Sequence, residues 1–109
     1  MADDKTQSIK GLDKTGLTIR DIALIRDVLS NEPAVKSAFL FGSRAKGTAG
    51  PASDVDLALD GLEDPLQAEA VAAALEELPL PYRFDVKAFA SIRHRPLREH
   101  IERVGIQIY

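Results

Sequence analysis

Apolar and polar residues alternate with regular spacings from residue 18 onward, and these spacings predict helices and strands. Thr18 can cap a first helix, which ends at the segment 31–33, Asn-Glu-Pro. The apolar stripe of this helix consists of Ile22, Ile25 and Leu29. An apolar run over 35–41 indicates a buried strand, a short helix is expected to begin within 44–47, and a second strand covers 55–59.

The second half of the chain continues this alternation. A helix is expected to start at 64–65, where Asp-Pro places proline at the first helical position, and to stop before Pro79. Residues 82–89 alternate between apolar and polar as a strand does, 96–104 show helical spacing, and 106–109 can add a short strand. Strands and helices in alternation predict a small α/β layer.

The chain is expected to form one domain. With 109 residues it can bury a modest core but is too small for a second substrate-binding domain. A hydrophobic fraction of 45% argues against disorder. Residues 1–16 carry charge, glycine and threonine without periodicity, so we expect a flexible tail there, with a partner-ordered arm as the alternative. The domain itself is expected over 17–109.

Composition narrows the possible partners and compartment. Lys and Arg number 14 and Asp and Glu number 17, so the formal charge of −3 does not favour non-specific nucleic-acid binding. The absence of cysteine excludes disulfides and thiolate metal sites. No apolar run approaches the roughly 18–20 residues that span a bilayer, and the N-terminus lacks a signal-peptide core. We therefore expect a cytoplasmic protein without a membrane partner.

The candidate chemistry lies between residues 39 and 59. The first apolar run ends in Gly42 and Ser43, a basic glycine-rich loop follows, and Asp54 and Asp56 open the second strand. Side chains two apart on a strand face the same side, so both carboxylates project together beside the loop. Mg²⁺ prefers such oxygen ligands together with substrate phosphates, and glycine lets a phosphate approach the backbone closely. The pattern predicts a metal clamp beside a phosphate cradle.

These residues resemble a known family. Gly42-Ser43, ten residues and then Asp54-Val55-Asp56 resemble the Gly-Ser-x10-Asp-x-Asp signature of the minimal nucleotidyltransferases, in the DNA polymerase β-like superfamily. The third mark of that family is an acidic residue on a later strand, and Asp85 within Phe-Asp-Val supplies it. The resemblance implies a polymerase β-like fold, with a small mixed β-sheet packed with helices.

The resemblance also implies a role for each of these residues. ATP would lay its β- and γ-phosphates on Gly42 and Ser43, while two Mg²⁺ ions would be bridged by Asp54 and Asp56. Asp85 would bind the second ion and help to deprotonate the attacking hydroxyl. Attack at the α-phosphorus would transfer a nucleoside monophosphate and release pyrophosphate.

Several other charged residues have both a functional and an ordinary interpretation. Arg44 and Lys46 would add positive charge beside the phosphates, but a basic loop is often merely solvated. Asp85 could likewise be an ordinary charge on the solvent face of a strand. His94 and His100 are six residues apart, which does not match a helical zinc pair. The arginines around them form a solvated face or a contact for an acidic partner or RNA.

The acceptor of the nucleotide is expected to come from another molecule. Small stand-alone members of the family are similar to antitoxins of bacterial and archaeal two-gene modules, which adenylylate a tyrosine of a HEPN ribonuclease toxin. The resemblance therefore implies an antitoxin that binds a HEPN-type toxin and transfers AMP to it. Three alternatives stay open: a non-catalytic inhibitory module, the catalytic subunit of a split small-molecule nucleotidyltransferase, and an RNA-modifying enzyme.

Overall fold

The computed structural model describes residues 9–109, which form a mixed α/β fold around one sheet. The sheet has four strands in the order β3-β2-β1-β4. In chain order the elements, with η marking 3₁₀ helices, are η1 (Leu12–Thr15), α1 (Ile19–Ser30), β1 (Ser37–Phe41), α2 (Gly42–Lys46), β2 (Val55–Asp60), α3 (Pro65–Glu76), β3 (Phe84–Ala88), η2 (Phe89–Ser91), α4 (Arg95–Val104) and β4 (Ile106–Gln107). The predicted fold class is confirmed.

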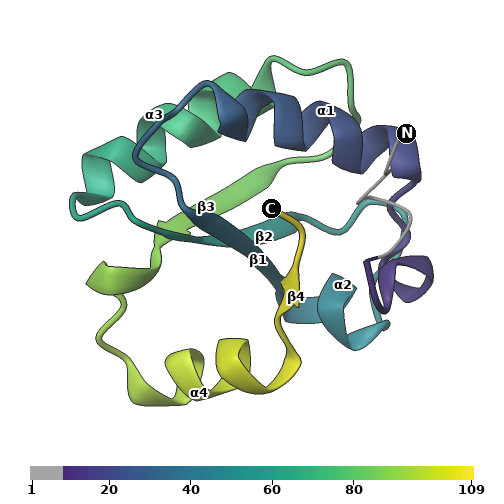
Figure 1. The fold of residues 1–109 in the computed structure, drawn as a ribbon. Helices are drawn as coiled ribbons and strands as arrows, with labels where there is room; N and C mark the ends of the chain where they lie inside the picture. The colour runs from purple at the N-terminus through teal and green to yellow at the C-terminus, as the bar shows by residue number, and fades with distance from the viewer. Residues whose placement is uncertain (1–8) are drawn as a thin grey trace.

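The strand directions bring three strand ends together. β1 runs antiparallel to both β2 and β4, whereas β2 and β3 are parallel. Figure 1 shows α1 and α3 over one face of the sheet and α4 on the opposite side. The carboxyl end of β1 therefore lies beside the amino end of β2, and the amino end of β3 lies on the other side of β2.

Two capping boxes determine where the long helices begin. At α1 the Asp21 N–H donates to the Thr18 hydroxyl, and the Thr18 N–H donates to the Asp21 carboxylate, both at 3.0 Å. At α3 a second box pairs Asp64 with Gln67, and Pro65 occupies the first turn. Each box satisfies backbone donors that a helix start leaves unpaired, so both helices start where the sequence predicts.

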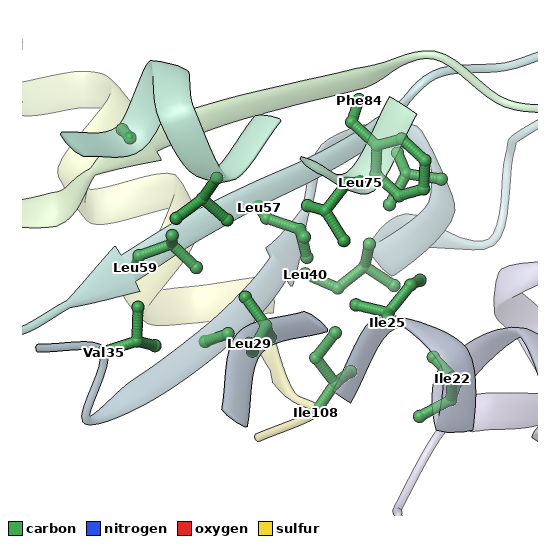
Figure 2. Packing of buried hydrophobic residues seen from close by; sticks show 14 of the residues in the cluster. Ile22, Ile25, Leu29, Val35, Leu40, Leu57, Leu59, Leu75, Phe84 and Ile108 are labelled. Atoms are coloured by element: carbon green, nitrogen blue, oxygen red, sulfur yellow. The ribbon is translucent and has the colours of Figure 1, made fainter. Parts of the chain in front are cut away.

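Most of the core lies between the sheet and the pair α1 and α3. Figure 2 shows the stripe of α1 facing the buried side chains of the strands. Fully buried members of this cluster include Ile22, Ile25, Leu29, Leu40 and Leu57. A smaller cluster on the α4 side contains Phe41, Ala58, Ile92 and Ile101. Burial on both faces explains why the segments that became β1 and β2 are nearly continuous apolar runs.

The expected tail differs from what the structure describes. Residues 1–8 lie outside the described residues. Leu12–Thr15, however, form a 3₁₀ helix, Thr15 is 1% exposed, and Ile9 and Leu12 pack against the main core. The expectation of a tail is therefore wrong for residues 9–16. The expectation failed because the segment is short: it can bury side chains without showing any hydrophobic period in its sequence.

Two element boundaries also differ from the prediction. α2 begins at Gly42, directly after β1, with no intervening loop. β3 ends at Ala88, whose carbonyl accepts from the Ser91 hydroxyl at 2.9 Å, and the chain then turns into η2.

No helix within residues 9–109 combines the length and the apolar character needed to cross a membrane.

Candidate active site

Strand pairing brings the three predicted carboxylates to one end of the sheet. Asp56 lies opposite Phe41 of β1 on one side and opposite Asp85 of β3 on the other. Directly paired residues project from the same face, and Phe41 packs in the cluster on the α4 side. Asp56 and Asp85 therefore face the α4 side. Asp54 precedes β2 by one residue and is two residues from Asp56.

Gly42 completes this end of the sheet. It follows Phe41, has φ of 74°, and begins α2. A β-carbon built on Gly42 would collide with the Asp56 carboxylate. The turn therefore needs glycine for two reasons, its left-handed backbone and the close approach of Asp56.

The carboxylates are close enough to influence one another. Burial, followed by the charges of Asp85 and Asp54, raises the pKa of Asp56 from 3.8 to about 6. The positive charges of Lys87 and Arg44 act in the opposite direction. A raised carboxyl pKa beside two like charges is typical of a site that binds a cation or handles protons.

The donor set fits Mg²⁺ by its chemistry. Carboxylates are the oxygen ligands that this ion takes, and a bound cation would relieve the repulsion that raises the Asp56 pKa. In the described part of the chain, no three acidic or histidine side chains are already grouped to hold a metal ion. The Asp85 carboxylate instead lies 3.7 Å from the Lys87 ammonium, and the side chains of Asp85 and Lys87 are 49% and 40% exposed. At that exposure the ion pair is weak, so little free energy would be lost if Asp85 turned toward a bound cation.

Arg44 does not lie in an exposed phosphate-binding loop, as the sequence had suggested. Its side chain is 1% exposed. Nη1 donates to the Thr15 carbonyl and Nη2 donates to the Ser53 carbonyl, each at 2.8 Å. The guanidinium also lies over the Tyr82 ring, 4.6 Å from its centroid. Arg44 is thus occupied inside the protein, where it holds the residue before Asp54, and the expectation that it contacts a triphosphate is corrected.

Two further predicted phosphate contacts, Ser43 and Lys46, also lie on α2. Ser43 is half-buried and directly follows Gly42, and its carbonyl accepts from the Thr48 N–H at 3.0 Å. Lys46 is exposed in the last turn, before Gly47 ends the helix with φ of 80°. Both side chains are therefore in positions compatible with the predicted contacts.

One residue of the site was missed by the sequence analysis. The Gly42 N–H donates to Nε2 of His100 on α4 at 3.2 Å. The rings of His100 and Phe41 also meet edge to face, with centroids 6.3 Å apart and an interplanar angle of 81°. The spacing of His94 and His100 spoke only against a zinc pair, and nothing in the local pattern connects Gly42 with His100, 58 positions away.

Comparison with protein families identifies the family of this fold. The family described as Polymerase beta, Nucleotidyltransferase matches residues 24–109. That range includes all the candidate site residues and His100, and it leaves out η1. Comparison with curated proteins gives no significant match.

Solved structures share the fold. The structure described as the toxin-antitoxin MntA-HepT matches with a TM-score of 0.65 and 19% identity, over 84% of this chain and 72% of that chain. The structure described as the toxin-antitoxin with AMP-PNP matches with a TM-score of 0.67 and 23% identity, over 82% of this chain and 72% of that chain. At these sequence identities, the likeness shows a shared fold and nothing beyond it.

Proposed function

The chain belongs to the polymerase beta nucleotidyltransferase family, and we propose that it is an antitoxin that transfers AMP from ATP to a tyrosine of a partner HEPN ribonuclease. The transferase part of the proposal is carried by the placement of Asp54, Asp56 and Asp85 around the Gly42 turn. The antitoxin part is supported by the fold shared with toxin-antitoxin structures, one of them described with AMP-PNP.

In the proposed reaction, the tyrosine oxygen forms a bond to the α-phosphorus of ATP. The bond between the α-phosphorus and the oxygen that bridges to the β-phosphate breaks, and pyrophosphate leaves with that oxygen. The phenolic proton passes to the Asp85 carboxylate, which is 49% exposed and can release it to water. The products are an AMP-tyrosine, pyrophosphate and the released proton, so atoms and charge balance.

The residues of the chain mainly position the triphosphate. Gly42 keeps the turn free of a side chain, the Ser43 hydroxyl donates to a phosphate oxygen, and the exposed Lys46 ammonium adds positive charge. Asp54, Asp56 and Asp85 would hold two Mg²⁺ ions. When bound, Mg²⁺ neutralises negative charge and serves as a template for the reacting oxygens.

The test combines the chain with Mg²⁺, each of four labelled nucleoside triphosphates and the product of the adjacent gene. Mass spectrometry of the partner then identifies any added monophosphate and its site. We expect AMP on a tyrosine with ATP as the donor, and no transfer by the Asp56→Asn variant. Asp60→Asn is a matched control, because Asp60 lies on the same strand but is exposed at its far end.

Other outcomes would favour the alternatives. An Asp56→Asn variant that neutralises the toxin fully would favour a non-catalytic inhibitory module. Label that appears on purified tRNA or on a small molecule, and not on the partner, would favour an RNA-modifying enzyme or a split small-molecule transferase. Transfer by Asp56→Asn at the wild-type rate would contradict the assignment of the carboxylates.

A further inference from the structure

The position of α4 is fixed independently of His100. Near the start of the helix, Arg98 Nη1 donates to the carbonyls of Phe89 and Ile92 at 2.9 and 3.0 Å. The Arg98 guanidinium also lies over the Phe89 ring, 4.2 Å from its centroid. After the helix, the chain passes into β4, where Ile106 pairs with Leu40 of β1. Because α4 is held at both ends, a substitution at His100 is expected to leave the helix in place.

The Gly42 N–H has no partner within α2, because Gly42 is the first residue of that helix. With φ of 74° and no β-carbon, Gly42 can occupy backbone conformations that other residues cannot. The Phe41–Gly42 peptide determines which way the Gly42 N–H points, and it also orients the turn that continues into Ser43. An acceptor on a fixed helix removes this freedom. His100 Nε2 is such an acceptor, and it can accept the N–H only when the imidazole proton is on Nδ1.

We propose that His100 is a positioning residue that holds the Gly42–Ser43 turn in its nucleotide-binding conformation by accepting the Gly42 N–H. The inference deepens the proposed function and rests on it for the identity of the nucleotide. It assigns the Gly42 N–H to His100, so the donors that remain for the triphosphate at this turn are the Ser43 N–H and hydroxyl. If the bond is lost, only a fraction of molecules have the competent turn, and the apparent Kd for ATP rises by the inverse of that fraction.

Three variants of the full chain separate the hydrogen bond from the ring contact. His100→Phe keeps an aromatic ring beside Phe41 but removes the acceptor. His100→Gln restores an acceptor at a similar distance from the backbone. His94→Ala is the matched control, because His94 is exposed at the start of the same helix and makes no side-chain capping bond there.

Two measurements are needed: the Kd for ATP with Mg²⁺ by calorimetry, and hydrogen exchange of the Gly42 N–H by NMR. We expect His100→Phe to raise the Kd about fivefold, the effect of losing one ordinary hydrogen bond. The Gly42 N–H should exchange faster by a similar factor. The value of kcat should change less than KM, because the carboxylates lie on β2, on β3 and directly before β2, and not on this turn. His100→Gln should lie close to the wild type, and His94→Ala should match it.

An unchanged or lower Kd in His100→Phe, or a Gln variant as impaired as the Phe variant, would overturn the proposal. If the wild-type chain binds no ATP, the proposed function fails. The exchange rate of Gly42 then still decides whether His100 holds the turn, because that measurement needs neither nucleotide nor partner.

Discussion

The Asp56 carboxylate occupies the space that a β-carbon on Gly42 would need, so these two residues are sterically matched across the β1–β2 pair. The match links the two halves of the sequence motif, which are separated along the chain by the rest of α2 and the loop after it. The carboxylate cannot lie against the backbone turn unless residue 42 is glycine. The site is therefore sensitive to a single added methyl group.

Gly42→Ala should reduce both stability and transfer. The left-handed conformation costs a residue with a side chain about 1–2 kcal/mol, and the new β-carbon would displace Asp56. A displacement of about 1 Å at a reacting centre can reduce activity about 10²-fold. Chemical denaturation and the transfer assay measure the two effects. Gly50→Ala is the control, because no atom lies within 4 Å of its added β-carbon, and it should match the wild type.

The raised pKa of Asp56 makes stability depend on pH in a defined direction. With a folded-state pKa of about 6 against 3.8, ionisation of Asp56 is disfavoured in the folded state. Below about pH 4 both states are protonated and the penalty is absent; it grows as the pH rises and is complete above about pH 6. The contribution of Asp56 to the free energy of unfolding should therefore fall across this window.

Asp56→Asn tests this sign. Because Asp56 is partly exposed and water screens its charge, we expect the variant to be more stable than the wild type at pH 7 by on the order of 1 kcal/mol. The gain should vanish near pH 4. Urea unfolding at both pH values measures it, with Asp60→Asn for comparison. A variant that is less stable at pH 7 would show that Asp56 makes favourable contacts that outweigh the repulsion.

Mg²⁺ should stabilise the wild-type chain in the absence of nucleotide. A cation bound among Asp54, Asp56 and Asp85 binds the folded state only, so Tm should rise with its concentration. The rise should be largest above pH 6, where Asp56 is ionised, and should be absent in Asp54→Asn and Asp56→Asn. Differential scanning fluorimetry with Mg²⁺ and with excess chelator makes the comparison. Equal shifts in all three proteins would place the ion elsewhere.

Much of the fold follows from local patterns in the sequence. The stripe of α1, the capping residues Thr18 and Asp64, and the alternation of β3 each have a local physical cause, and each predicted element is present. The site follows in part, because Asp54 and Asp56 are two residues apart at the start of β2. Placing Asp85 beside them needs the parallel pairing of β2 and β3, which local spacing does not show; the family resemblance implied only an acidic residue on a later strand.

What the sequence could not show is which polar side chains turn inward. Arg44 follows Gly-Ser in a basic stretch, and its charge alone suggested a phosphate contact. Whether an arginine faces solvent or carbonyl groups depends on chain segments distant in sequence, here Thr15, Ser53 and Tyr82. The contact of His100 with the Gly42 turn could not be predicted for the same reason, because its partner is 58 residues away.

Arg44→Met should distinguish an arginine that binds buried carbonyl groups from one that contacts the triphosphate. The substitution leaves the carbonyls of Thr15 and Ser53 without a donor, and each unsatisfied buried group costs about 1–3 kcal/mol. We therefore expect a marked loss of stability in chemical denaturation, and a loss of transfer because Ser53 precedes Asp54. Lys46→Met is the matched control: it removes a basic residue from the same short helix, but an exposed one, so stability should change by less than about 0.5 kcal/mol. If Arg44→Met instead kept its stability and only raised the KM for ATP, Arg44 would have to reach the triphosphate, and its buried position would not be the one in which it works.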